Sequence, residues 1–143
     1  MEKTIIWDID GILGLPLESY AHAIPLAPGL ELFNAVLKSA IFGETFNIII
    51  LTHRPEYARS DTLDWLRSVF NFSDFGTDFI NSKLFMRADD DSRPAAEYKK
   101  SFIQENFIDI NEQIICAFDD DPAVVDMYRS MGITVYQAFN KRE

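Results

Sequence analysis

Carboxylate side chains follow two apolar segments of the chain, and both positions suit chemistry at a phosphate group. Asp8 and Asp10 come after the apolar residues 4–7, and the acidic run 119–121 follows the apolar residues 114–118. A carboxylate can attack phosphorus and form an aspartyl phosphate. Neighbouring carboxylates also suit Mg²⁺, a hard cation that takes oxygen ligands. The residue types therefore predict a Mg²⁺-dependent reaction at phosphorus.

Three further residues could complete such a site. Thr52 and Arg54 follow the apolar residues 48–51, and Lys99 lies before the second acidic run, with its neighbour Lys100 as a rival for the same position. Fixed cations and hydrogen-bond donors stabilise the negative charge that builds up on the phosphate oxygens during transfer. Gly11 has no side chain, so main-chain N–H groups can approach a phosphate closely at this position.

Apolar and amphipathic segments alternate along the chain. The pattern predicts strands at residues 4–8, 47–52, 83–86, 113–118 and 133–138, with helices at 30–41, 55–70, 95–106 and 122–131. Residues 11–20 and 71–81 are predicted to be loops. Such alternation indicates an α/β fold with three Rossmann-like layers, in which a parallel sheet is flanked by helices. Ligands bind beyond the carboxyl ends of such strands, where the carboxylates should gather.

Composition limits the class of protein. The 143 residues suit one domain, 1–143, and the formal net charge of −10 argues against tight non-specific binding to nucleic acid. The single cysteine excludes an internal disulfide and a thiolate metal site. We find neither a secretory signal nor an apolar run of roughly 20 residues, so we expect a cytoplasmic location with no membrane partner.

The spacing of these residues resembles a known family. Asp8-Ile9-Asp10-Gly11, Thr52, Lys99 and Asp119-Asp120 match the motifs of the haloacid dehalogenase superfamily of phosphatases. The stretches LTHRPEYARSDTLDWL, LFMRADDDSRPAAEYKK and FDDDPAVVDMYRSMGITVYQ resemble the 3′-phosphatase domain of polynucleotide kinase. The resemblance implies a haloacid dehalogenase-type sheet without a sizeable cap domain, and an open site that large substrates can enter.

The resemblance also implies a role for each motif residue. Asp8 would be the nucleophile, and Asp10 would protonate the leaving oxygen and then activate water. Thr52 would hold a phosphate oxygen, and Lys99 would neutralise the nucleophile and the phosphate. The implied Mg²⁺ ligands are Asp120, with Asp119 in support, Asp8, and Asp10 through its main-chain carbonyl.

Substrate contacts are implied less directly. Arg54 could grip the substrate phosphate, and His53 stands where glycine is common, so it could face the substrate. Ile12 replaces the usual threonine, which could lower activity. Ala95 replaces an acid found in the kinase-linked phosphatases.

Several functions remain open from the sequence. The first hypothesis is a phosphomonoester hydrolase acting on polynucleotide 3′-phosphate ends, and the alternatives are a nucleotide or sugar phosphatase and a catalytically degenerate binding domain. A receiver-type phospho-acceptor domain uses similar residues, but its acidic pair would follow the first strand. The acidic run 89–91 is predicted to be a solvated turn. The arginines that could contact nucleic-acid phosphates are Arg54, Arg59, Arg87 and Arg93.

Overall fold

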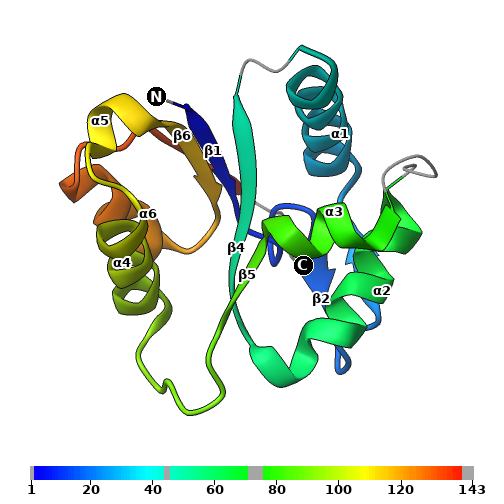
Figure 1. The fold of residues 1–143 in the computed structure, drawn as a ribbon. Helices are drawn as coiled ribbons and strands as arrows, with labels where there is room; N and C mark the ends of the chain where they lie inside the picture. Colours follow the sequence, from blue (N-terminus) through cyan, green and yellow to red (C-terminus); the bar gives the residue numbers. More distant parts are fainter. Residues whose placement is uncertain (1, 44–45, 71–75, 140–143) are drawn as a thin grey trace.

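The computed structural model describes residues 2–43, 46–70 and 76–139 (Figure 1). Its main sheet has the strand order β5-β4-β1-β6-β7, and every neighbouring pair is parallel. The predicted α/β fold with a parallel sheet is therefore confirmed. The strands are β1 (Thr4–Trp7), β4 (Asn47–Pro55), β5 (Leu84–Arg87), β6 (Ile114–Asp119) and β7 (Val135–Gln137).

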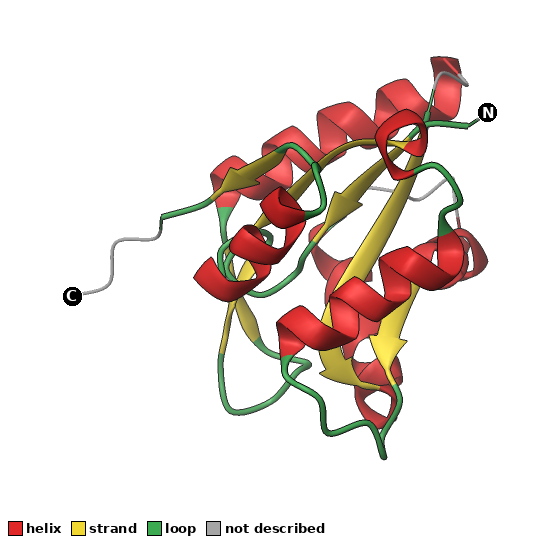
Figure 2. Ribbon diagram, turned by 90° about the vertical axis from the view of Figure 1, so that its left-hand side faces the viewer, coloured by secondary structure: helices red, strands yellow, loops and turns green. Residues whose placement is uncertain are grey.

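Helices cover both faces of this sheet, which gives three layers (Figures 1 and 2). One face carries α1 (Ala27–Gly43), α2 (Arg59–Val69) and α3 (Gly76–Lys83), and the other carries α4 (Ala95–Asn106), α5 (Ile110–Gln113) and α6 (Pro122–Ser130). None of the helices in the described part of the chain is both long and apolar enough to cross a membrane.

The strands are apolar at nearly every position because each of their faces is buried under helices. In β1, Ile5 and Trp7 join the core beneath α1 and α2, whereas Ile6 joins the core beneath α4 and α6. Trp7 is fully buried and packs edge-on against Phe33 of α1. The side chains that follow these strands consequently emerge at a rigid edge of the sheet.

A small β hairpin begins within the predicted loop 11–20 and continues beyond it. Strands β2 (Gly14–Pro16) and β3 (Ala23–Pro25) pair in antiparallel fashion. The indole nitrogen of Trp65 in α2 donates a hydrogen bond of 3.0 Å to the carbonyl of Ala23. This contact with a distant helix holds the hairpin, which explains why its short, weakly patterned strands were missed. In the described residues, this hairpin is what the chain inserts between β1 and α1, which agrees with the expected lack of a sizeable cap.

Other boundaries also differ from the prediction: α1 is longer than the predicted helix 30–41, and α5 was not predicted. Strand β4 continues past Thr52, because Pro55 is still in register with Arg87 of β5. The predicted helix 55–70 is divided into a 3₁₀ turn, η1 (Glu56–Ala58), and α2. Part of the predicted loop 71–81 is helical, since α3 begins at Gly76, while residues 71–75 and the tail 140–143, which was expected to be frayed, lie outside the described residues.

Candidate active site

Most of the predicted site residues gather around one pocket at the carboxyl edge of the sheet, but Thr52 and Arg54 do not line it. It has a volume of about 260 Å³. Its wall includes the predicted residues Asp8, Asp10, Gly11, His53, Lys99, Asp119 and Asp120. Parallel strands place their carboxyl ends at one edge, so segments that are far apart in the sequence meet here.

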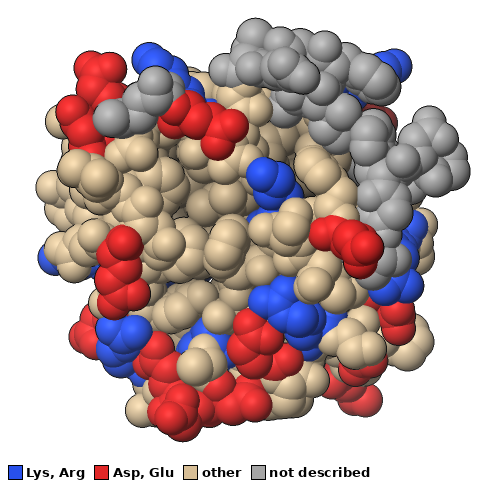
Figure 3. All heavy atoms as spheres, in the orientation of Figure 1, with Lys and Arg blue, Asp and Glu red and all other residues tan. Residues whose placement is uncertain are grey.

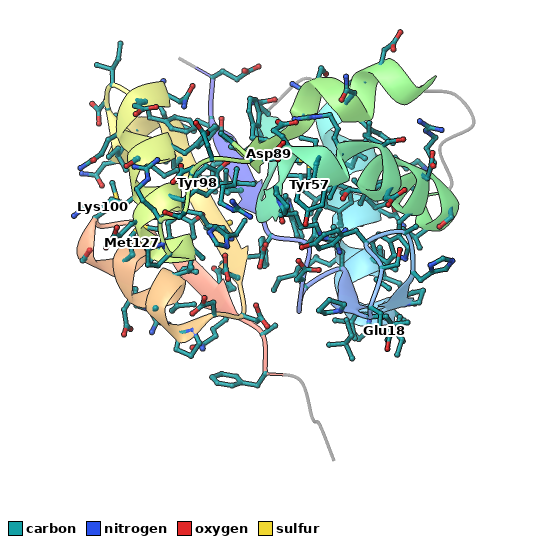
Figure 4. All side chains as sticks on the ribbon, turned by 90° about the horizontal axis from the view of Figure 1, so that it is seen from below. Glu18, Tyr57, Asp89, Tyr98, Lys100 and Met127 are labelled. Atoms are coloured by element: carbon teal, nitrogen blue, oxygen red, sulfur yellow. The ribbon has the colours of Figure 1, made fainter. Side chains whose placement is uncertain are left out.

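Asp8 and Asp119 share one buried ammonium group, that of Lys99. Lys99 Nζ lies 3.2 Å from Asp8 Oδ1 and 2.7 Å from Asp119 Oδ2. All three side chains are buried: that of Asp8 is 9% exposed, that of Asp119 is 1% exposed and that of Lys99 is 2% exposed. Lys100 is exposed and points away from the site at the outer side of α4 (Figure 4). The lysine that reaches the site is therefore the predicted Lys99 and not its neighbour.

Burial and charge act in opposite directions on this group. Burial raises the pKa of Asp8 well above its usual value, Lys99 opposes that rise, and Asp119, Asp10 and Asp120 add to it. Burial lowers the pKa of Lys99, but Asp8 and Asp119 outweigh it and leave the pKa raised. The lysine is consequently held in its charged form between the two carboxylates.

The donor set suits a hard divalent cation. One carboxylate oxygen from each of Asp8, Asp119 and Asp120 lies within 4.8 Å of the others. Burial, followed by the charge of Asp119, raises the pKa of Asp120. Crowded carboxylates with raised pKa values are stabilised by a cation placed between them. Asp119 Oδ2 accepts a hydrogen bond from Lys99, and Asp119 Oδ1 accepts one from the N–H of Asp121. Because both oxygens of Asp119 are already hydrogen-bonded, Asp8 and Asp120 are the better candidates for direct contact with a cation.

Asp10 has a different partner. The guanidinium of Arg54 donates to both carboxylate oxygens, from Nη2 to Oδ1 at 2.6 Å and from Nε to Oδ2 at 3.1 Å. The Asp10 side chain is 32% exposed, whereas that of Arg54 is 1% exposed. This pairing separates the Asp10 carboxylate from the cluster of three, so its expected metal contact would have to come from its main-chain carbonyl.

Arg54 is itself held from three sides. Its Nη1 donates to the hydroxyl of Thr62 and to the carbonyl of Tyr20, and the Tyr20 ring lies 5.0 Å from its guanidinium carbon. The guanidinium of Arg54 faces Asp10 here, and its expected contact with the substrate phosphate stays a prediction. Neither Thr62 nor Tyr20 stood out in the sequence, since no local pattern marks a residue that supports a buried arginine.

Two other expected phosphate contacts take different positions. Thr52 is fully buried, and its hydroxyl oxygen accepts a hydrogen bond from the N–H of Arg54 at 3.2 Å. The N–H of Gly11 donates to the carbonyl of Gly14 at 2.8 Å rather than pointing at a ligand. Gly11 has a φ of +86°, and a side chain there would collide with the carboxylate of Asp120. Glycine at this position therefore permits the close approach of the Asp120 carboxylate.

The remaining predicted residues flank the pocket. His53 lines it, and its Nε2 is 2.8 Å from the carbonyl of Arg93. Ala95 also lines the pocket. Ile12 is 5% exposed and joins the core under α1, so its side chain is directed away from the carboxylates.

The other arginines that were candidates for nucleic-acid contacts already have acceptors. Arg59 pairs with Glu56 at 2.7 Å, Arg93 pairs with Asp91 at 2.7 Å, and Arg87 donates to main-chain carbonyls, including that of His53. Acidic and basic side chains accordingly lie side by side along the lower edge of the face shown in Figure 3. Asp89 and Asp90 are exposed, as expected for a solvated turn.

Together, the parallel sheet and its edge of carboxylates define a phosphatase fold of the haloacid dehalogenase type. The family model described as "Polynucleotide kinase PNKP phosphatase domain" matches residues 2–141. The chain therefore belongs to the family of polynucleotide kinase phosphatase domains. A comparison with curated proteins returned no match.

Solved structures support the same fold. Two structures, described as the Pnkp1/Rnl/Hen1 complex and the Pnkp1/Rnl/Hen1 RNA repair complex, each contain a chain that is 24% identical with a TM-score of 0.71. The match covers 96% of this chain but 46% and 42% of those chains, so the chain spans less than half of their length. A class C acid phosphatase from Bacillus anthracis, in a structure with tungstate bound, is 13% identical, with a TM-score of 0.57 over 96% of this chain and 68% of that chain.

Proposed function

We propose that the protein hydrolyses phosphomonoesters through an aspartyl phosphate on Asp8, with polynucleotide 3′-phosphate ends as the preferred substrate. The observation that carries the proposal is the asymmetric setting of two carboxylates in one pocket. Asp8 is buried beside Lys99 and the acidic cluster, whereas Asp10 is more exposed and oriented by Arg54. This difference supports attack by Asp8 and proton transfer by Asp10.

The first half of the reaction forms the covalent intermediate. A carboxylate oxygen of Asp8 attacks phosphorus, and the bond between phosphorus and the ester oxygen breaks. Asp10 gives its proton to the departing oxygen, which leaves as an alcohol. Lys99 stabilises the charge near Asp8, because its ammonium lies 3.2 Å from the attacking carboxylate.

The second half regenerates the enzyme. Asp10, now deprotonated, takes a proton from a water molecule, and the resulting hydroxide attacks phosphorus. The bond between phosphorus and Asp8 breaks, which releases inorganic phosphate and restores the Asp8 carboxylate. When bound to Asp8 and Asp120, with Asp119 in support, Mg²⁺ would supply positive charge opposite the phosphate oxygens.

Two features support a nucleic-acid 3′ end as the substrate. The family model is that of a polynucleotide kinase phosphatase domain, and the hairpin 14–25 leaves the pocket without a large cap. A small nucleotide or sugar phosphate also fits an open pocket of about 260 Å³, and it remains the alternative. A catalytically degenerate binding domain is the second alternative, and its support is Ile12, an apolar residue of the core under α1 where the related phosphatases usually have a threonine.

The test is phosphate release from 4-nitrophenyl phosphate and from 3′-phosphorylated oligonucleotides, with Mg²⁺ and with EDTA. We expect Mg²⁺-dependent turnover that falls at least about a thousand-fold in Asp8→Asn, which removes the nucleophile. Asp89→Asn is the matched control, because Asp89 is an exposed acid outside the pocket. Turnover that survives in Asp8→Asn would overturn the proposed intermediate, and faster turnover of 5′-phosphorylated oligonucleotides or sugar phosphates would overturn the preferred substrate.

A further inference from the structure

A second pocket adjoins the acidic one on the α1 side of the sheet. Its volume is about 400 Å³, which is within the range of small-ligand sites. It is lined mainly by apolar and aromatic side chains, including Trp7, Ile12, Leu32 and Tyr136. Gly11 lines both pockets, so they share a wall at the loop that follows the nucleophile.

The floor of this pocket is an aromatic ladder across three strands. Trp7 of β1 is in register with Phe118 of β6, which is in register with Tyr136 of β7. The Trp7 and Phe118 rings stack at 4.1 Å between centroids, and the Phe118 and Tyr136 rings at 5.4 Å. Trp7 and Phe118 immediately precede Asp8 and Asp119, so the ladder lies one residue behind the acidic cluster.

The outermost ring of this aromatic ladder is exposed. Tyr136 is 57% exposed, and Leu32 across the pocket is 46% exposed. An exposed aromatic face beside a phosphate site is suited to stacking against a nucleobase, because every base offers a π-face.

The pocket also offers polar groups. The indole N–H of Trp7 is buried, and among the described residues it has no hydrogen-bond partner. Gln137 donates to the main-chain carbonyl of Asp120 at 3.5 Å and so connects the pocket to the acidic cluster. Trp7 is fully buried, so of these two groups the partly buried side chain of Gln137 is the one that a base could contact.

Charge gives a further reason to favour base recognition. The protein has a formal net charge of −10, and Arg54, Arg59, Arg87 and Arg93 are all engaged with carboxylates or carbonyls. A long polyanion would find few free cations among these residues. Stacking is an attraction that does not depend on a positively charged surface.

We propose that this aromatic pocket binds the base of the terminal nucleotide whose 3′-phosphate lies over Asp8. The inference rests on the proposed phosphatase function and narrows its substrate to nucleotide 3′-phosphates held by their base. The terminal nucleotide supplies most of the binding, so chain length and salt concentration change the KM little.

The kinetic test compares a substrate that has a base with one that has none. The readout is the ratio of kcat/KM for adenosine 3′-monophosphate to kcat/KM for glycerol 2-phosphate. We expect Tyr136→Ala to lower this ratio about five- to 100-fold, which is the range for the loss of one base–aromatic stack. Tyr136→Phe should keep the ratio because it keeps the ring. Ile115→Ala is the control, since Ile115 is a partly exposed apolar residue of β6 that lines neither pocket.

A binding test separates this inference from the proposed function. Trp7 and Trp65 are the two tryptophans of the chain, so Trp65→Phe leaves Trp7 as the only reporter. Adenosine, which has no phosphate, should quench Trp7 emission in this variant, and adding Tyr136→Ala should weaken the effect at least about five-fold. If neither adenosine 3′-monophosphate nor glycerol 2-phosphate is hydrolysed, the proposed function fails. The adenosine titration still tests whether the pocket binds a base.

Two results would overturn the inference. One is an unchanged kcat/KM ratio in Tyr136→Ala, and the other is the absence of quenching by millimolar adenosine. A KM that falls steeply with oligonucleotide length and rises with salt would also contradict it, because it would assign recognition to the phosphate backbone. Occupation of the pocket by a partner protein or a second copy of the chain would appear as a change in molecular mass without adenosine binding.

Discussion

Asp8 and Asp10 lie two residues apart in the sequence, yet the fold gives them opposite surroundings. Asp8 lies beside the compact ammonium of Lys99, which comes from the α4 side of the sheet and also bonds Asp119. Asp10 meets the planar guanidinium of Arg54, which comes from β4 and is braced by Thr62 and Tyr20. The two carboxylates are thereby separated in both charge environment and orientation.

The difference supports the proposal that one short motif supplies two chemical functions. A lysine is a point charge, so it neutralises Asp8 without fixing which oxygen is presented. An arginine bonds both oxygens of a carboxylate and fixes its plane. Proton transfer depends on a carboxylate held in one orientation within reach of the bridging oxygen. Arg54 fixes the plane of Asp10, but one of its two contacts has to break when Asp10 carries the proton.

Neutralising Asp10 should have the largest effect on the contrast between the two carboxylates. We expect Asp10→Asn to lower turnover about 10²- to 10⁴-fold, because proton transfer is lost in both halves of the reaction. With 4-nitrophenyl phosphate, whose leaving group needs little protonation, the variant should release about one equivalent of nitrophenol in a burst and then stop. Asp8→Asn should give no burst. Linear turnover in Asp10→Asn at a rate near that of the wild type would remove Asp10 from this role.

Removal of the shared cation should have its main effect on folding. Lys99→Met leaves Asp8 and Asp119 buried without their partner, and we expect a loss of about 3–5 kcal/mol in the free energy of unfolding. Urea denaturation in the presence of EDTA measures this loss, and Lys100→Met is the control because Lys100 is exposed on the same helix. Equal stability of the two variants would show that the buried group does not depend on Lys99.

Substitution of Arg54 tests whether turnover depends on the fixed orientation of the Asp10 carboxylate. Arg54→Lys keeps the charge but loses the bidentate contact, so kcat should fall about ten- to 100-fold while KM changes little. Arg59→Lys is the control, since Arg59 makes a comparable contact with Glu56 outside the pocket. A rise in KM at constant kcat would instead indicate that Arg54 grips the substrate phosphate.

The exposed pair Asp91–Arg93 should give the smallest effect. Hydrogen bonds from Arg93 lower the pKa of Asp91 to about 2. Because the pKa is depressed in the folded state, the pair stabilises the protein above the ordinary value of 3.8, and the effect is lost as the pH falls towards 2. Thermal unfolding should show a slight loss for Asp91→Asn at pH 6 that shrinks as the pH falls. A loss as large as that of Lys99→Met would contradict this ranking, since solvent screens exposed pairs.

Much of the fold was predictable because its main signals are local. The apolar runs of β1, β4 and β6 follow from burial on both faces, and helix α4 has the predicted bounds, 95–106. The hairpin 14–25 and helix α3 were not predicted, because both depend on packing against other elements rather than on a strong pattern of their own. The predicted nucleophile, lysine and acidic pair do meet in one pocket.

By itself, the sequence determined which carboxylates would meet, because parallel strands bring their carboxyl ends to one edge and the motif residues follow those ends. It also determined that Lys99 stands on a helix next to that edge. Only the tertiary structure decided that Arg54 faces Asp10, that Ile12 turns into the core, and that Trp7, Phe118 and Tyr136 form one ladder. These relations depend on side-chain direction and strand register, which are set by packing between segments far apart in the chain.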